Sequence, residues 1–466
     1  MSLASQVGAM SLGRAVALGG ALLVAVTLSR LLEPAVYGQY RQVWLLYGLL
    51  IPGFTSALCT ALYAHLASEK GAAYLGWAKR LLWGWGLASG ALLVVAAPLW
   101  MRLGGWEGER ILWAFAPYFV GSTLAGVLEP VLVAGLKRPR SWVRYNLLYN
   151  LAQLGAILGP IWAGGALLEV GLALSAVAVL RALYALRAYR LFQVREPVSA
   201  EALWAFTRYL GPLLALEAVG VLARHLDQLI VSGAFDARTF AFYHNGAREV
   251  PLFTVLLSSL SAALVAHLSP WSGPDPERMA YVRASASWAA RALLPAAAFL
   301  FVFAEPTMVV LYGPEYRASA AVFRIYLLLI PLRLYMPQAL VLASGRSPWI
   351  LRAGLLEVVV NAGLCVVLLP LLGWWGPALA ALVGNLAEKI TLGWWTWRTW
   401  RVGLRELWPA AVVWRYGALS MLLWVAVSAL GTVCGLSELL LWALGAAALG
   451  AWLLWTYRGN PASARA

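Results

Sequence analysis

Charged side chains lie inside long apolar segments of this 466-residue chain, and these are the residues that could do chemistry. A charge at the centre of a lipid bilayer costs roughly 3 kcal/mol on insertion scales, so each such residue is expected to face a wet interior or a partner. The charged residues within or near apolar segments are Arg14, Glu129, Glu217, Arg224, Asp227, Arg248, Glu249, Arg333 and Glu357.

The arginines predict an anion site. Guanidinium groups are planar and permanently charged, and they offer two parallel N–H groups to a phosphate. Arg14, Arg224, Arg248 and Arg333 are therefore the candidate phosphate ligands. For Arg14 and Arg333, which lie nearer the ends of their segments, snorkelling to the membrane surface is the competing interpretation.

An uncharged polar stripe occurs on the segment 144–164. Asn146, Tyr149, Asn150 and Gln153 recur at helical spacing, and their side chains suit the hydroxyl groups of a sugar. Packing between helices explains the same stripe almost as well. Asn146 and Asn150 are taken as candidate substrate ligands.

The segment 206–231 carries an acidic and basic stripe. Glu217, Arg224, Asp227 and Gln228 fall on one helical face, which is expected to face a cavity. A purely structural Arg224–Asp227 ion pair is the alternative, because residues three apart are neighbours on a helix.

A cation site is predicted from oxygen-bearing side chains on three segments. Glu357 and Asn361 are four residues apart on one face, Asn385 lies on the next segment, and Asp227 lies on 206–231. Such groups can hold a sodium ion or relay a proton. The alternative is that they only join helices, since interhelical polar bonds average about 0.6 kcal/mol.

The composition predicts an all-α polytopic membrane protein. The chain is 62% hydrophobic and 12% charged, whereas charged residues make up about a quarter of an average soluble protein. Only helices can carry long apolar runs through lipid one after another. About 14 transmembrane helices are predicted, at 11–32, 41–66, 76–100, 111–135, 144–164, 167–190, 206–231, 239–268, 284–304, 318–343, 350–370, 375–397, 408–431 and 437–457.

The net charge of +15 is explained by topology. Basic residues concentrate in alternate connections between the segments, which places those connections and both termini in the cytoplasm of a bacterial inner membrane. The first apolar segment lacks a cleavage site and is expected to stay as the first span. No nucleic-acid partner is predicted.

Signals for catalysis are missing from the sequence. There is no phosphate-binding G-x-x-x-x-G-K-[ST] loop, and neither the three cysteines nor the four histidines show metal-ligand spacing. We therefore predict no enzyme, no cofactor and no metal site, and leave Na⁺ or H⁺ as alternative coupling ions.

A weak internal repeat predicts the domain organisation. Residues 134–144 resemble 343–352, and residues 32–41 resemble 235–244, at a similar offset. We predict two six-helix bundles related by a pseudo-twofold axis, at 1–195 and 196–402. Residues 403–466 would add two helices and a cytoplasmic tail. Parallel repeats of this kind place a substrate cavity at the midplane between the halves.

Several segments together resemble a known family. They are Gly13-Arg14, Leu28 to Tyr40, Leu226 to Gly233, Leu311 to Tyr316 and Asn361 to Gly376. They are similar to the oligosaccharide and polysaccharide flippases (Wzx-like) of the multidrug/oligosaccharidyl-lipid/polysaccharide (MOP) exporter superfamily. The resemblance implies two bundles that alternate between inward- and outward-open states around a cationic cavity. In related lipid II flippases a sodium site lies on helices seven, eleven and twelve, where Asp227, Glu357, Asn361 and Asn385 stand here.

The predicted function is therefore translocation of an isoprenoid-pyrophosphate-linked oligosaccharide from the cytoplasmic to the outer leaflet, for surface polysaccharide biosynthesis. The expected partners are that lipid, the membrane lipids, and the polymerase or glycosyltransferase machinery. A lipid II flippase and a cation-coupled multidrug antiporter of the same superfamily are the alternatives. A third, from another class, is a membrane scaffold that transports nothing.

Overall fold

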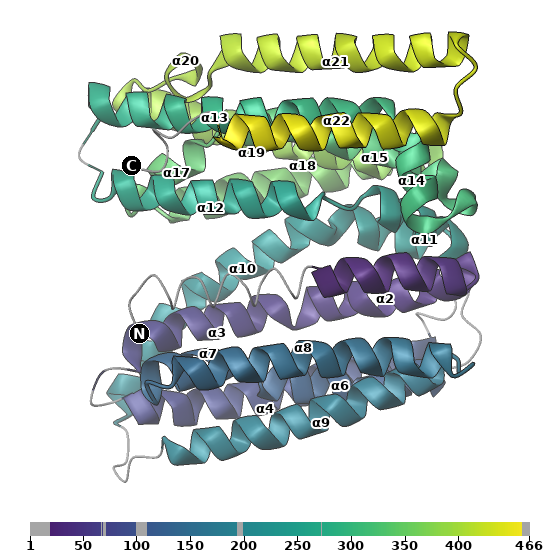
Figure 1. The fold of residues 1–466 in the computed structure, drawn as a ribbon. Helices are drawn as coiled ribbons and strands as arrows, with labels where there is room; N and C mark the ends of the chain where they lie inside the picture. The colour runs from purple at the N-terminus through teal and green to yellow at the C-terminus, as the bar shows by residue number, and fades with distance from the viewer. Residues whose placement is uncertain are drawn as a thin grey trace. The chain divides into compact units, whose positions relative to one another are not determined.

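The computed structural model describes residues 19–66, 68, 71–98, 110–192, 199–271 and 273–458, and Arg14 lies outside them. Helices and short turns make up these residues, with no β-strand among them (Figure 1). The predicted all-α fold is confirmed. The chain divides into two compact units, residues 1–241 and 242–466, and each is described by itself.

In the first unit, α6 packs between α4 and α9, α8 lies beside α9, and α10 packs against α2 and α3 (Figure 1). Its helices are Gly19–Leu31, α2 (Pro34–Leu50), α3 (Pro52–His65), α4 (Gly71–Val95), α6 (Arg110–Leu124), α7 (Leu128–Pro130), η1 (Val131–Gly135), α8 (Pro139–Trp162), α9 (Leu167–Leu191), α10 (Ala200–Ala234) and the start of α11 (Ala237–Gly246).

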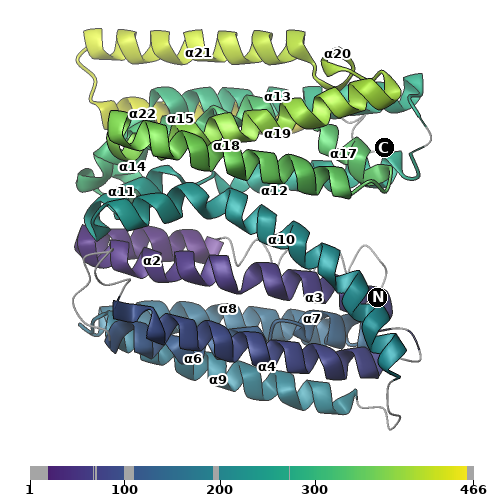
Figure 2. The same ribbon diagram turned by 180° about the vertical axis from the view of Figure 1, so that it is seen from behind.

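In the second unit, α18 and α19 form a long helical hairpin (Figure 2), and α13 packs against α21 and α22. Its helices after α11 are α12 (Pro251–Leu268), α13 (Pro276–Val302), α14 (Ala304–Tyr312), η2 (Pro314–Ala318), α15 (Ser319–Leu327), α16 (Leu329–Arg333), α17 (Pro337–Ala343), α18 (Pro348–Leu372), η3 (Gly373–Trp375), α19 (Gly376–Trp400), α20 (Leu404–Leu407), α21 (Ala410–Val433) and α22 (Glu438–Arg458).

The two copies of the 134–144 repeat share a local design. Before α8 the backbone turns through Lys137 at φ 53°, and before α18 it turns through Gly345 at φ 70°. Pro139 and Pro348 then stand in the first turn of the next helix, where the missing N–H of proline leaves no helical bond unmade. The similar sequences therefore build similar helix junctions.

Each predicted span overlaps one or more helices, but some spans begin elsewhere or are broken into shorter helices. The segment 41–66 begins earlier, at Pro34. The segment 239–268 is broken into α11 and α12 before Pro251, because proline cannot donate the helical hydrogen bond. The segment 318–343 is divided as well, with a bend of 51° before α17.

The helices are consistent with a protein that crosses a membrane many times. Among the described residues, eight helices are long and apolar enough to cross a membrane, or up to nine if the bent pair is one span. Three of these eight stretches contain more than one consecutive helix, namely Pro34–His65, Arg110–Gly135 and Pro348–Trp400. The predicted bundles at 1–195 and 196–402, with 403–466 appended, stay a prediction.

Candidate functional site

The side chains of the polar stripe on α10 differ in their burial. Asp227 is buried, at 1% exposure, and so is Gln228, whereas Arg224 is exposed. Glu217 accepts a hydrogen bond from the Ser56 hydroxyl of α3 at 2.8 Å. The Asp227 side chain is therefore shielded from solvent, and the Arg224 side chain is not.

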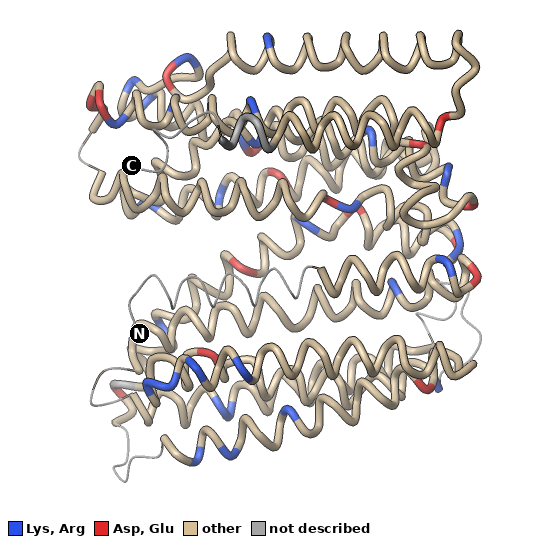
Figure 3. Tube along the Cα trace, in the orientation of Figure 1, with Lys and Arg blue, Asp and Glu red and all other residues tan. Residues whose placement is uncertain are grey.

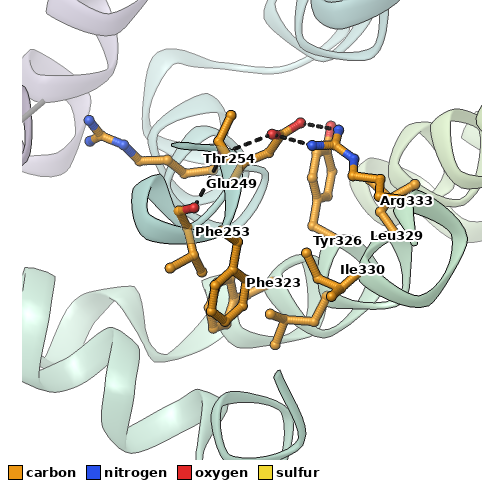
Figure 4. A pocket seen from close by; sticks show the side chains of 11 residues that line it. Glu249, Phe253, Thr254, Phe323, Tyr326, Leu329, Ile330 and Arg333 are labelled. Carbon is orange, nitrogen blue, oxygen red and sulfur yellow. Dashed lines mark hydrogen bonds and ion pairs between the residues drawn. The ribbon is translucent and has the colours of Figure 1, made fainter. Parts of the chain in front are cut away.

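Arg333 in the second unit is held by a carboxylate. Both of its terminal nitrogens donate to the two carboxylate oxygens of Glu249, one of them at 2.6 Å (Figure 4). Thr254 donates a further hydrogen bond to Glu249 at 3.3 Å. Arg248 lines the same pocket. The predicted phosphate ligands Arg248 and Arg333 thus border the same pocket. Arg333 already has an anionic partner that sequence reasoning did not assign to it.

Three of the four predicted cation ligands lie on the α18–α19 hairpin. Asn385 donates to the Glu357 carboxylate at 3.5 Å, and Asn361 is buried one turn further along α18. A side chain at Gly384 would come within 3.0 Å of the Glu357 backbone oxygen, so the two helices are in close contact here. Asp227 belongs to the first unit, and the four-residue site therefore stays a prediction.

Lys389 is a buried cation that sequence reasoning missed. Its ammonium group donates to the Gln338 side-chain oxygen at 2.7 Å and lies 3.5 Å from the Glu388 carboxylate. Glu357 is within electrostatic range of Glu388, Lys389 and Arg333. The second unit thus contains a set of neighbouring charges, of which Lys389 is buried and Glu357, Glu388 and Arg333 are half-buried. Lys389 could have been found from the sequence, because it is a charged residue inside an apolar segment, like the candidate site residues that were predicted.

The polar stripe on α8 borders a pocket of about 220 Å³ inside the first unit. Asn150 and Gln153 line it from α8, and Arg41 lines it from α2. Asn146 accepts two hydrogen bonds from the Asn150 side-chain nitrogen, at 2.8 Å and 3.0 Å. Of the two predicted sugar ligands, Asn150 therefore borders open space, and Asn146 orients it.

Arg41 and Arg181 were also missed as cations inside spans. Arg41 was taken as a residue at the edge of a segment, but it lies within α2 and is buried. Arg181 lies within α9 and donates to the Tyr145 hydroxyl at 2.8 Å. Within the described residues, no three His, Cys, Asp or Glu side chains are grouped to hold a metal ion.

The fold defines the class of protein. The chain is similar to a lipid II flippase, MurJ, in an inward closed conformation, with 13% identity, 98% of each chain covered and a TM-score of 0.71. It is also similar to an inward-facing multidrug resistance MATE family transporter of the MOP superfamily, with 16% identity, coverage of 81% of this chain and 93% of the other, and a TM-score of 0.58. A MOP superfamily transporter from Pyrococcus furiosus matches with 15% identity, coverage of 84% and 93%, and a TM-score of 0.52. The chain therefore has the fold of the MOP superfamily transporters.

Part of the chain also matches a known protein family. Residues 165–321 match the model of the polysaccharide biosynthesis protein family. Together with the fold, this match confirms the resemblance to Wzx-like flippases that was drawn from the sequence. A comparison with curated proteins gave no match.

Proposed function

We propose that the protein translocates an isoprenoid-pyrophosphate-linked oligosaccharide from the cytoplasmic to the outer leaflet of a bacterial inner membrane, for surface polysaccharide biosynthesis. One observation carries the proposal: residues 165–321 match a polysaccharide biosynthesis family within a chain whose fold covers 98% of a lipid II flippase. The protein is then a transporter and not an enzyme.

Arginines neutralise the pyrophosphate in this proposal. Arg224 is exposed on α10, and Arg248 and Arg333 line one pocket of the second unit. Arg14, outside the described residues, completes the proposed set. Fixed guanidinium groups suit a phosphate because they donate parallel, charge-assisted hydrogen bonds to its oxygen atoms. Asn146 and Asn150 contact the sugars, while the isoprenoid chain stays in the lipid.

An ion gradient biases the transport cycle in the same proposal. Asp227, Glu357, Asn361 and Asn385 supply the oxygen atoms that would hold Na⁺ or exchange H⁺. Moving one charge through the membrane potential contributes about 2.3 kcal/mol per 100 mV, which is enough to favour one of two states by more than tenfold.

Topology and partners follow from the same reasoning. The basic connections place both termini in the cytoplasm. A lipid-linked glycan delivered to the outer leaflet is a substrate for polymerase or glycosyltransferase machinery, and that machinery is the proposed protein partner.

Lipid II is the second candidate substrate. The observation that favours it is the match to MurJ, at 98% of each chain and a TM-score of 0.71, against 0.58 for the MATE transporter. A lipid II flippase would rescue cells depleted of their own lipid II flippase. A flippase for surface glycans would not rescue those cells, but it would restore surface polysaccharide in cells that lack their own glycan flippase. A multidrug antiporter would instead change drug sensitivity.

The direct test is flipping in proteoliposomes. A labelled lipid-pyrophosphate oligosaccharide from the native host is followed for the wild type, Arg224→Ala and the control Arg317→Ala, with and without a Na⁺ or H⁺ gradient. Arg317 is a matched control because it is also exposed and pairs with Glu305 at the surface. We expect transport to be lost in Arg224→Ala and kept in Arg317→Ala. A folded wild-type protein that moves no such lipid would overturn the proposal.

A further inference from the structure

Arg181 is a cation inside α9 that contacts two tyrosines of α8. Its Nε donates to the Tyr145 hydroxyl at 2.8 Å, and its guanidinium carbon lies 4.1 Å from the centre of the Tyr149 ring. The Tyr149 hydroxyl is 3.4 Å from that of Tyr118, to which Gln153 donates at 3.1 Å. Phenol groups thus fix the position of the guanidinium without neutralising its charge.

No carboxylate pairs with Arg181 in the part of the chain that the structure describes. Arg333 and Lys389 of the second unit differ in this respect, because Arg333 contacts Glu249 and Lys389 contacts Glu388. A charge held at this depth without a counter-ion costs several kcal/mol unless water or an anion reaches it. A cation–π contact with one tyrosine offsets about 2 kcal/mol of that cost when it is desolvated, and it leaves the positive charge in place. The remaining charge favours an anionic ligand.

Space for such a ligand exists beside Arg181. A groove of about 430 Å³ runs between α8 and α9 and is lined by Arg144, Tyr145, Tyr149, Arg181 and Tyr184. Its rim carries Leu148 and Leu180, each 67% exposed. The groove therefore combines two arginines and three phenols with apolar surface. That combination matches a lipid with a phosphorylated head group.

The groove is lined by α8 between Ser141 and Ala152 and by α9 between Val177 and Tyr184. Lys and Arg residues gather at the end of the first unit where α8 begins and α9 finishes (Figure 3). Arg144 lies in the first turns of α8, whereas Arg181 lies ten residues before the end of α9 at Leu191. At 1.5 Å per residue this places Arg181 about 15 Å along the helix from its end. The positive-inside rule assigns that end to the cytoplasm, the side on which a flippase substrate is made.

We propose that the α8–α9 groove binds the phosphate of a lipid from the cytoplasmic leaflet. Arg181 and Arg144 pair with the phosphate oxygens, Tyr145 keeps the Arg181 guanidinium in place, and the lipid chain lies against Leu148 and Leu180. The identity of that lipid as the isoprenoid-linked substrate rests on the proposed function. In that case the groove is a subsite that receives the substrate from the membrane before transport.

The test measures lipid binding to the full chain purified in detergent, by native mass spectrometry. Four probes are compared: polyprenyl pyrophosphate, phosphatidylglycerol, polyprenol without phosphate, and inorganic pyrophosphate. We expect Arg181→Gln to weaken binding of polyprenyl pyrophosphate at least tenfold, the loss that corresponds to about 1.4 kcal/mol for one charge-assisted pair. Arg187→Gln, an exposed change on the same helix, should leave binding unchanged.

Two further variants distinguish a loss of lipid binding from a loss of folding. Tyr145→Phe removes only the hydroxyl that Arg181 contacts, and it should weaken binding a few-fold with the fold intact. Arg181→Lys keeps the charge, so it should bind more tightly than Arg181→Gln. Thermal unfolding without lipid confirms that each variant is folded.

The outcomes separate this proposal from the proposed function. Equal binding of polyprenyl pyrophosphate by Arg181→Gln and by the wild type would overturn the proposed lipid site. The same conclusion would follow if the wild type bound polyprenol as tightly as polyprenyl pyrophosphate. Neither result would affect flipping as measured with Arg224→Ala. Preference for the isoprenoid over phosphatidylglycerol would identify the substrate as the source of the phosphate. Equal affinity for both would support a site for membrane phospholipid.

Discussion

Arg333 and Glu249 form a two-pronged ion pair between residues 84 positions apart, and it joins the end of α16 to the break between α11 and α12. The two side chains are 26% and 35% exposed, so neither charge is fully hydrated. Removing one partner leaves the other charge partly buried and alone. We expect Glu249→Gln to lower the free energy of unfolding by about 2 kcal/mol.

Thermal unfolding in detergent would measure this effect, and a double-mutant cycle with Arg333→Gln would isolate the pair. The matched control is Glu438→Gln, which breaks the exposed Arg317–Glu438 pair and should cost less than about 1 kcal/mol. Additive single and double variants would mean that Arg333 and Glu249 do not stabilise each other.

Lys389 supplies a fixed positive charge beside Glu388 in the second unit. Its ammonium lies 3.5 Å from Glu388, and Glu357 interacts with both residues. In Lys389→Met the carboxylates lose this counter-charge, so we expect a loss of stability that added Na⁺ partly restores. The wild type should respond less, because its own ammonium already neutralises Glu388.

The measurement is the unfolding midpoint of Lys389→Met in sodium chloride and in choline chloride at equal ionic strength. Lys389→Arg serves as the control, since it keeps the charge and should behave as the wild type does. Identical midpoints of Lys389→Met in the two salts would show that the oxygen groups near Lys389 do not bind sodium.

Much of the fold could be predicted because hydropathy and length report directly on helices that cross a membrane. Single charges such as Asp227 and Glu357 could be found in the same way. Asn385, which donates to Glu357, was in the predicted set as well. The partner of Lys389 could not be predicted, since Gln338 is 51 positions away and meets it only through the packing of α17 against α19. The contact between Asn146 and Asn150 was within reach, because it depends only on the helical repeat.

Hydropathy also hides breaks in the backbone. The segment 239–268 is apolar enough to be read as one helix, and only Pro251 signals that it divides into α11 and α12. Arg181 was visible as a charge within an apolar segment. Its aromatic surroundings depend on the contact between α8 and α9, which no periodicity within either helix reveals.

Gly121 permits the close contact of α6 and α9. A Cβ at this position would lie 2.6 Å from the backbone oxygen of Ala178, too close for any atom to accommodate. Small residues at such crossings let membrane helices pack closely. We expect Gly121→Ala to force α6 and α9 apart and to cost about 1–3 kcal/mol.

Gly155→Ala on α8 is the matched control, because no atom lies within 4 Å of its added Cβ. Alanine favours a helix over glycine, so this variant should be neutral or slightly more stable. Unfolding in detergent compares the two. Equal stability of Gly121→Ala and Gly155→Ala would contradict the tight crossing.

Trp424 holds α21 against α13. It is 7% exposed, it packs on Phe299 and Phe303, and its indole N–H donates to the backbone oxygen of Pro295 at 3.1 Å. In Trp424→Leu the Pro295 oxygen would lose the indole N–H as a donor, and the ring contacts with Phe299 and Phe303 would be lost as well. We expect the free energy of unfolding to fall by about 2 kcal/mol, since membrane helices associate through packing and hydrogen bonds.

Trp414→Leu is the control on the same helix, because Trp414 is 69% exposed and should contribute little to stability. Protease access to α21 in detergent should rise in Trp424→Leu alone, and an equal rise in both variants would mean that α21 is not held at Trp424.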